Sequence, residues 1–467
     1  MLGLFNTLNM GARAMQASQL AVEVTGQNLA NSSNAAYSRQ QVVLQTSVAT
    51  PTSIGMQGTG VDAVSIQQMR DAMLDGQVRD EASVSGYWGS QQSSLEDAQA
   101  QLGEFLNING TGSASDAQGL SDQLNNLFNS FQGLATSPTS IPQRQNVVGQ
   151  AQALATGLNQ ASQQLSALND GLNTSVTNDV TTANQLISQI ADLNDQIASA
   201  TFSGGTANDL NDSREQALEQ LSGLVNIQTT ANSNGTVDVS IGGTQLVSGK
   251  NVLDTLQSYD SGNGQMLVRT ATGGTPLTLT GGSIQGTIDA RDGALKTLRD
   301  GLDTLASSLI TQVNGIYSAG YDLNGGTGAT LFTGTDASTI GVNTAVQTDP
   351  SLVQAAGAPG ATGDNSVALA LAQLGTQNVA SLGNKTFSGA FAAQVGSFGF
   401  ALSNANSEAA NQGSVTTMLQ NQRDSVSGVS LEEEMANLIT FQQAYSASSK
   451  IITTVDQMLQ TVIAMKT

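Results

Sequence analysis

Apolar residues recur every seven positions near both ends of the chain. The N-terminal row is Leu8, Met15, Val22 and Leu29. The C-terminal row is Leu431, Leu438, Tyr445, Ile452 and Leu459. A seven-residue apolar repeat is typical of helices that pack along their length against other helices. We therefore expect a long coiled-coil helix at each end of the chain, and these nine residues are its candidate assembly contacts.

Small residues accompany the N-terminal row, each three positions later: Gly11, Ser18 and Thr25. Small side chains let a partner helix approach closely. The C-terminal segment instead carries apolar residues over more of its surface than a two-stranded seam needs, which favours burial by several neighbours. Chain ends are usually the least ordered parts of a domain. Because these ends are strongly patterned, we expect them to pair with each other and with other copies.

The C-terminal helix has a clear start signal. Ser430 can cap it, Glu432, Glu433 and Glu434 fill its first turn, and Ser430 with Glu433 has the spacing of a capping box. Three-four spacing of leucine and isoleucine then predicts a very long helix, or two in line, over 143–200. Further helices are expected over about 207–224, 86–107, 117–135, 286–317, 365–382 and 388–425.

Short alternating runs with glycine breaks predict strands over 226–284. Asn234-Gly235 within them is the pair preferred in a type I′ hairpin turn. Residues 35–70 look extended, and 319–363 is irregular and rich in Gly, Ala and Thr. The predicted fold is therefore mainly α with inserted β. It has long terminal coiled-coil helices, a helical-bundle middle domain and a small β-rich outer domain.

The predicted domains are discontinuous in sequence. Residues 1–60 and 415–467 form the terminal helical assembly domain. Residues 61–225 and 285–414 form the helical middle domain, including the irregular segment. Residues 226–284 form the β-rich domain.

Composition narrows the function. The 467 residues include no cysteine and no histidine, which excludes disulfides, cysteine-ligated metals, catalytic triads and histidine bases. A net charge of −21 argues against binding nucleic acid or an anionic membrane. The N-terminus lacks a charged segment, a continuous apolar segment and a signal-peptide cleavage site, and no apolar run is long enough to span a membrane.

Three stretches only partly match ligand-binding motifs. Residues 248–250 (SGK) lack the following Ser or Thr and the earlier glycine of a phosphate-binding loop, and GMQGTG at 55–60 lacks the strand-then-helix context of a dinucleotide site. DLNDSRE at 209–215 begins like a calcium loop, but Arg214 stands at the required glycine. We expect no catalytic residue, no cofactor and no metal.

The stretch NLANSSNAAYSRQ resembles the N-terminal signature of bacterial flagellar rod, hook and hook-associated proteins. The matching residues are Asn28, Asn31, Tyr37, Ser38 and Arg39. Ala36 stands where that signature usually has Gly. The C-terminal SGVSLEEEMANLITFQQAYSASSKIITTVDQMLQTVI resembles the matching end of the same proteins. Within this group, YSRQ at 37–40 and NDLNDSREQALEQLSGLVNIQTT at 208–230 are most similar to the hook-associated protein 1 (FlgK) family.

The resemblance implies a self-assembling structural protein of the flagellum, not an enzyme. It would be exported through the flagellar type III system without a cleaved signal peptide and would form a ring of about eleven copies at the hook–filament junction. The implied partners are hook protein, the second junction protein and a cytoplasmic secretion chaperone at the C-terminal region. Alternatives are a hook or distal-rod protein and a secreted adhesin-like surface protein, or, least expected, an enzyme using carboxylates in the β-rich domain.

The matched N-terminal motif should end the first helix and turn the chain outward. Its asparagines could satisfy the last helix carbonyls and adopt left-handed conformations. Tyr37 and Arg39 would then be free to contact a neighbouring subunit.

Overall fold

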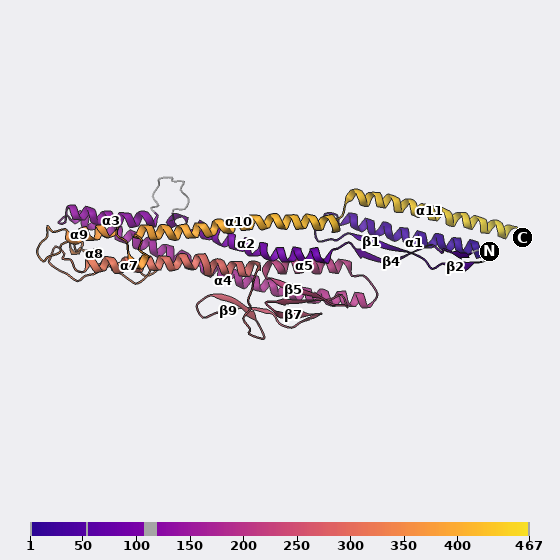
Figure 1. The fold of residues 1–467 in the computed structure, drawn as a ribbon, viewed down its shortest axis with the longest axis horizontal. Helices are drawn as coiled ribbons and strands as arrows, with labels where there is room; N and C mark the ends of the chain where they lie inside the picture. The colour runs from indigo at the N-terminus through magenta and orange to yellow at the C-terminus, as the bar shows by residue number, and fades with distance from the viewer. Residues whose placement is uncertain (1, 53–54, 107–118, 466–467) are drawn as a thin grey trace.

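The protein is a long rod, with both termini at one end and most helices running along its length (Figure 1). The computed structural model describes residues 2–52, 55–106 and 119–465. The α-helices are α1 (Leu2–Ala30), α2 (Ala72–Leu106), α3 (Leu120–Thr136), α4 (Ile141–Phe202), α5 (Asn208–Leu224), α6 (Gly282–Ala290), α7 (Lys296–Tyr317), α8 (Thr344–Thr348), α9 (Ser366–Leu374), α10 (Phe387–Ser427) and α11 (Leu431–Ala464). A π-helical turn, η1 (Arg291–Leu295), joins α6 to α7, and two 3₁₀ turns are η2 (Pro350–Leu352) and η3 (Ala380–Leu382).

The strands form small antiparallel sheets. The strands are β1 (Gln40–Thr46), β2 (Thr50–Thr52), β3 (Gly55–Gln57), β4 (Val61–Gln68), β5 (Ile227–Ala231), β6 (Val237–Ile241), β7 (Thr244–Ser248), β8 (Asn251–Val252), β9 (Leu256–Asp260), β10 (Met266–Thr270), β11 (Phe332–Thr333) and β12 (Gly341–Val342). Strands β5 to β8 make a four-stranded meander, while β9–β10, β11–β12, β2–β3 and β1–β4 are two-stranded. The expectation of a mainly helical fold with inserted strands is confirmed.

The 62-residue α4 runs along much of the rod. It is one unbroken helix, whereas the sequence was compatible with either one helix or two helices in line. The Ser140 side chain caps it by accepting a hydrogen bond from the Gln143 N–H, 3.4 Å away, and proline stands in its first turn, where a missing N–H costs nothing. Gly157 allows α3 to approach, since a Cβ there would lie 3.1 Å from Leu120 Cδ2. The leucines of the three-four repeat face inward along its whole length.

Two hydrophobic cores share α4. The first half of α4 packs with α3, α7, α9 and the start of α10. The second half packs with α5, α6 and the strands β5, β6, β7, β9 and β10. The strands predicted as a separate outer domain therefore bury their apolar face on α4, as Figure 1 also shows by their position along its side.

The terminal part of the rod consists of α1, α11 and the β1–β4 pair. The predicted domain boundary at residue 415 falls inside α10, which continues beside α2 to Ser427. Residues 428–430 form a short sideways step between α10 and α11, and both helices run toward the same end of the rod (Figure 1). Strand β4 pairs with β1 across the other predicted boundary at residues 60/61.

Two local predictions need correction. The loop between β5 and β6 spans 232–236 and contains Asn234-Gly235, but only Gly235 has a positive φ (+84°), so the turn is not type I′. The irregular segment 319–363 contains β11, β12, α8 and η2. It is fixed in part by the fully buried Arg144, whose guanidinium donates to the carbonyls of Ser351 and Val353.

Candidate functional site: the terminal helix pair and its joint

Helices α1 and α11 pack side by side and antiparallel along their length, as the paired patterns at the two chain ends predict. The closest approach uses the small residues: a Cβ on Gly11 would lie 3.1 Å from Ile452 Cγ1 and 3.7 Å from the Ser448 backbone oxygen. Gly11 and Thr25 are buried, and Ser18 is half-buried. Side chains larger than these would hold the two helices apart.

Apart from Ile452, which packs on Gly11, the large residues of the heptad rows flank this seam rather than fill it. The half-buried members are Leu8, Met15, Val22, Leu29, Leu438, Ile452 and Leu459. Leu431 and Tyr445 are 52% and 38% exposed. The buried apolar residues of the pair are instead Ala17, Ala21, Val24 and Val455. The structure therefore leaves much of the predicted contact surface open.

A shallow groove of about 450 Å³ opens between the two helices near their middle. Its walls are Gln19 and Val22 from α1 and Gln442, Tyr445 and Ser446 from α11. Val22 and Tyr445 are among the predicted contact residues. Their apolar surfaces and the three polar side chains give the groove a mixed lining.

The matched N-terminal motif forms the joint between the helix pair and the body, centred on the buried Asn28. The Asn28 amide nitrogen donates to the Gln40 carbonyl at 2.9 Å and to Glu434 Oε2 at 3.0 Å. Its Oδ1 accepts from the Gln40 N–H at 3.0 Å and from the Tyr37 hydroxyl at 2.8 Å. One side chain thus uses both of its ends to hold the end of α1, the start of β1 and the start of α11 together.

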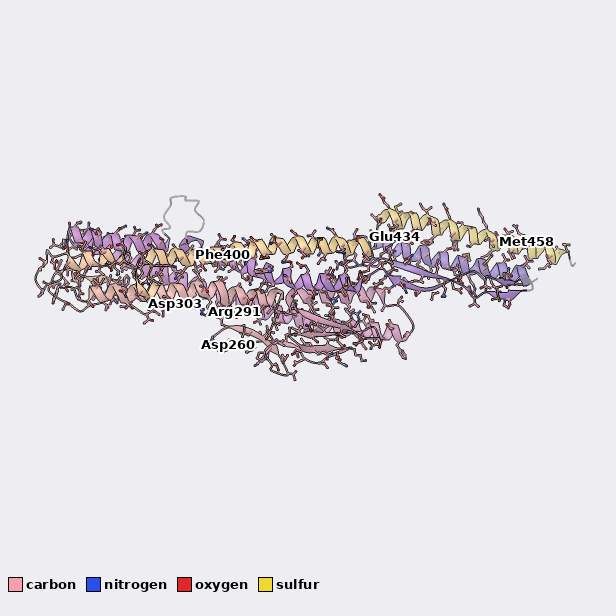
Figure 2. The ribbon with its side chains drawn as sticks, in the orientation of Figure 1. Asp260, Arg291, Asp303, Phe400, Glu434 and Met458 are labelled. Carbon is pink, nitrogen blue, oxygen red and sulfur yellow. The ribbon has the colours of Figure 1, made fainter. Side chains whose placement is uncertain are left out.

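Arg39 holds the same elements together through ion pairs. Its Nε donates to Glu434 Oε1 and its Nη2 to Glu433 Oε1, both at 2.8 Å. The Glu434 side chain is only 2% exposed and that of Arg39 is 21% exposed, so the pair is largely shielded from solvent. The Arg39 N–H also donates to the Ser427 carbonyl at 2.8 Å, which ties the joint to the last residue of α10. Figure 2 shows Glu434 where α11 begins beside α1.

The other half of the joint comes from α5, whose sequence contains the NDLNDSRE stretch. Asp212 Oδ2 accepts the Ser38 N–H at 3.0 Å, and Asp209 Oδ1 accepts from the Gln40 side chain at 2.8 Å. Arg70 lies between Asp75 (3.1 Å) and Asp212 (3.4 Å). The two sequence segments that most resemble the FlgK family therefore contact each other across 174 residues of chain.

Burial raises the pKa values of several groups in the joint. It raises the pKa of Asp212, although hydrogen bonds from Ser38 and the charge of Arg70 oppose this. It also raises the pKa of Glu219 against the charge of Arg423. Burial and the nearby carboxylates Asp209, Asp212 and Glu434 raise the pKa of Tyr37, so its hydroxyl stays protonated and donates to Asn28. For Arg39 burial lowers the pKa, but Glu433 and Glu434 outweigh it, and the pKa is raised.

Two expectations for this motif were wrong. Tyr37 and Arg39 are not free, because Asn28, Glu433 and Glu434 of the same chain occupy them. The asparagines do not adopt left-handed conformations: among the described residues other than glycine, Asn384 alone has a positive φ. The expectation that they satisfy the last helix carbonyls is confirmed for Asn31, whose side chain donates to the Gln27 carbonyl at 3.0 Å.

Ala36 causes no strain in place of the usual Gly, because its φ is not positive and its N–H donates to Asn34 Oδ1 at 3.1 Å. The predicted start of α11 after Ser430 is confirmed. The capping box does not form, since the Ser430 side chain makes no capping hydrogen bond and Glu433 pairs with Arg39.

Sequence reasoning did not place Gln40, Asp209, Asp212 or Glu434 in the joint. Asp209 and Asp212 are three positions apart on a helix, and that spacing could have indicated a common face. Across residues 2–52, 55–106 and 119–465, no group of three or more acidic side chains is arranged to hold a metal ion. In the same ranges no helix is both long and apolar enough to cross a membrane.

Comparisons with known proteins agree with the fold. Residues 105–332 match the family model described as flagellar hook-associated protein FlgK helical domain. Residues 416–465 match the model of the flagellar basal body rod FlgEFG protein C-terminal region. The chain is 28% identical to flagellar hook-associated protein 1 of Bacillus subtilis, over 98% of both chains, and 23% identical to that of Escherichia coli, over 98% of this chain and 99% of the relative.

A solved structure has the same fold. The flagellar hook junction protein FlgK from Burkholderia pseudomallei superimposes with a TM-score of 0.64 at 19% sequence identity, covering 74% of this chain and all of that one. The similarity to the curated relatives extends over nearly the full length of both chains, including the helix pair and the joint. The chain therefore belongs to the FlgK family of flagellar hook-associated proteins, which are structural proteins of the bacterial flagellum.

Proposed function

We propose that this chain is the subunit that joins hook and filament, and that it polymerises through α1 and α11. One observation carries the proposal: α11 is 34 residues long, yet its buried residues are Glu434, Ser448 and Val455. A helix that long with so little buried surface is unusual in a folded monomer, because helices in proteins are stabilised mainly by packing an apolar face. Neighbouring subunits would supply the missing contacts.

The same reasoning assigns roles to the predicted contact residues. Leu431 and Tyr445 would be buried by a neighbouring copy, while Leu438, Ile452 and Leu459 would be covered further on assembly. The joint would keep the helix pair at a fixed angle to the body, since Asn28, Arg39 and Asp212 each bond across it.

The proposal includes a purely structural role without catalysis. The joint has many charged groups, but Arg70, Arg79 and Arg423 pair with Asp75, Asp212, Glu215 and Glu219. Each of these cations is paired within the chain, so the charged groups of the joint are explained as bonds between its elements.

The finer assignments follow from family membership. Copies would form a ring of about eleven at the hook end, between hook protein and the second junction protein. The chain would leave the cell through the flagellar type III system with a chaperone on its C-terminal region. The exposed apolar residues of α11 support that last assignment, because such a surface needs protection before assembly.

A hook or distal-rod role is the second candidate, since residues 416–465 match a basal body rod model. The match of residues 105–332 to the FlgK helical domain favours the junction role. Electron microscopy of a deletion strain separates the two. The junction role predicts hooks without filaments and flagellin released into the medium; absence of hooks would contradict it and support the rod or hook role.

A further inference from the structure

Beyond the first turn of α11, the helix pair has balanced charges in a strongly acidic chain. The chain carries a net charge of −21, whereas α1 contains one cation and one anion, Arg13 and Glu23. Beyond Glu434, α11 likewise contains only Lys450 and Asp456 as charged residues. Copies of an acidic protein repel one another over most of their surface, and this repulsion is weakest where charges balance. The balanced charge of the helix pair therefore favours a second copy of this chain as its partner.

The groove between the helices lies on one flank of this neutral surface. Val22 and Tyr445 supply its apolar lining and Gln19, Gln442 and Ser446 its polar edges. A shallow groove with a mixed lining suits one flexible apolar side chain with water excluded around it.

A ridge of exposed apolar side chains lies on the opposite flank of the same helix pair. Ile451, Met458 and Val462 are 41%, 51% and 43% exposed, and their spacing of seven and four places them on one face of α11. At about 100° per residue, Met458 lies about 140° around the helix from Tyr445. Figure 2 shows Met458 toward the C-terminal end of α11. Groove and ridge thus face away from each other, and one copy cannot fill its own groove.

We propose that the groove of one copy receives the Met458 ridge of a second copy displaced along the helix axis. The groove is centred near residue 444 of α11 and the ridge near residue 457, so the displacement is about 20 Å at 1.5 Å per residue. Because two different surfaces meet, the contact is heterologous and repeats from copy to copy, giving a ring or a helical assembly instead of a closed dimer. The inference rests on the proposed self-assembly and adds which surfaces meet.

Cysteine crosslinking tests the contact directly, since the natural chain has no cysteine. Ser446→Cys and Met458→Cys are introduced singly and together, and flagella isolated from cells expressing only the variant are oxidised. The two positions are 12 residues apart on one helix, about 18 Å, which is too far for a disulfide within one chain. The double variant should give a ladder of crosslinked multimers, while each single variant stays monomeric on a denaturing gel.

Two outcomes would overturn the inference: a monomeric double variant, or single variants that crosslink as strongly as the double. Ser446→Cys with Met418→Cys is the matched control, because Met418 is 58% exposed but lies on α10. This control should not crosslink. Intact filaments on cells with no crosslinks would reject the groove contact and leave the junction role standing, whereas a deletion strain with normal filaments would reject the junction role itself.

A charge pair tests the contact where the cysteine variants fail to assemble. Gln442→Lys and Met458→Glu should each reduce the number of filaments per cell by about tenfold or more, because each places a charge in an apolar contact. The double variant should restore filaments, because the new charges meet across the interface. A double variant as defective as the single ones would contradict the proposed pairing.

Discussion

The long helices α4 and α11 show two ways of using an apolar pattern. In α4 the repeating leucines are buried from end to end by two cores. In α11 the apolar residues are as regular, yet Leu431, Met435, Ile439, Met458 and Ile463 are each more than half exposed. The pattern alone predicts a helix in both cases. What differs is the number of neighbours within the chain, so the exposed pattern marks where neighbours from outside are needed.

The first prediction measures this difference with one leucine in each helix. Leu154→Ala in α4 should reduce the free energy of unfolding by about 2–5 kcal/mol, because Leu154 is fully buried and its removal leaves a cavity. Leu459→Ala in α11 should cost the monomer about 1 kcal/mol or less, since Leu459 is only half-buried. Thermal and denaturant unfolding of the purified monomers measures both. Equal losses would mean that α11 is as well packed as the body.

The second prediction separates the two regions at the joint. Arg39→Ala leaves the Glu434 carboxylate buried without its cation. Removing one partner of a fully buried pair costs about 3–5 kcal/mol; since Arg39 is 21% exposed, we expect about 2–3 kcal/mol. The loss should fall on the docking of α11, so limited proteolysis should cut near Gly428 earlier while the body resists.

Glu432→Ala is the matched control, because Glu432 neighbours the pair in the same helical turn but makes neither of these bonds. It should leave the cleavage rate near Gly428 unchanged. If Arg39→Ala also leaves that rate unchanged, the ion pair does not hold the helix pair to the body.

The third prediction concerns how closely α1 and α11 approach. Gly11→Val adds a branched side chain whose Cβ alone would lie 3.1 Å from Ile452 Cγ1, so it should cost about 1–3 kcal/mol and separate the helices. Gly26→Ala on the same helix meets nothing within 4 Å and should stabilise α1 by about 0.5–1 kcal/mol. Helix content by circular dichroism and hydrogen exchange of α1 amides would report both. If Gly11→Val leaves helix content and hydrogen exchange unchanged, the close approach at Gly11 is not needed for the two helices to pack.

Much of the fold could be predicted because its helices are long and strongly periodic. The spacing of Leu154, Leu158, Leu165 and Leu172 predicts α4 without any knowledge of its neighbours. The joint could not be predicted in the same way. Asn28 bonds to Glu434, 406 residues later, and nothing local to either residue indicates the other.

The heptad rows illustrate the same limit. Periodicity indicates that Val22 and Tyr445 lie on apolar faces, but it does not tell which side of the face the partner helix occupies. The small residues Gly11 and Thr25 determine the side on which the partner helix packs. They allow the two backbones to approach closely, which leaves most of the larger residues at the edge of the seam. The groove forms because Val22 and Tyr445 lie at this edge instead of filling the seam.

The last and smallest expected effect is the change of folding stability with pH. This change has opposite signs at one carboxylate in the body and one in the joint. Asp254 accepts hydrogen bonds from the backbone N–H groups of Thr272, Gly273 and Thr255, which lowers its pKa to about 2. Its contribution to stability is complete above its ordinary pKa of 3.8 and is lost as the pH falls toward 2. Burial raises the pKa of Asp212 in the joint, so the folded state binds that proton more readily and this site gains stability as the pH falls.

Hydrogen exchange at pH 5 and pH 3 can distinguish these two contributions. Amides of β9 and β10 should lose protection on acidification, and Asp254→Asn should remove most of that change, because the amide has no charge to lose. Asp195→Asn is the matched control, since Asp195 is exposed and pairs with Lys250 at 3.2 Å. It should leave the change in place. Amides around Ser38 should lose less protection than those of β9, since protonation of Asp212 relieves a buried charge; an equal loss in both regions would mean that burial does not set the pKa of Asp212.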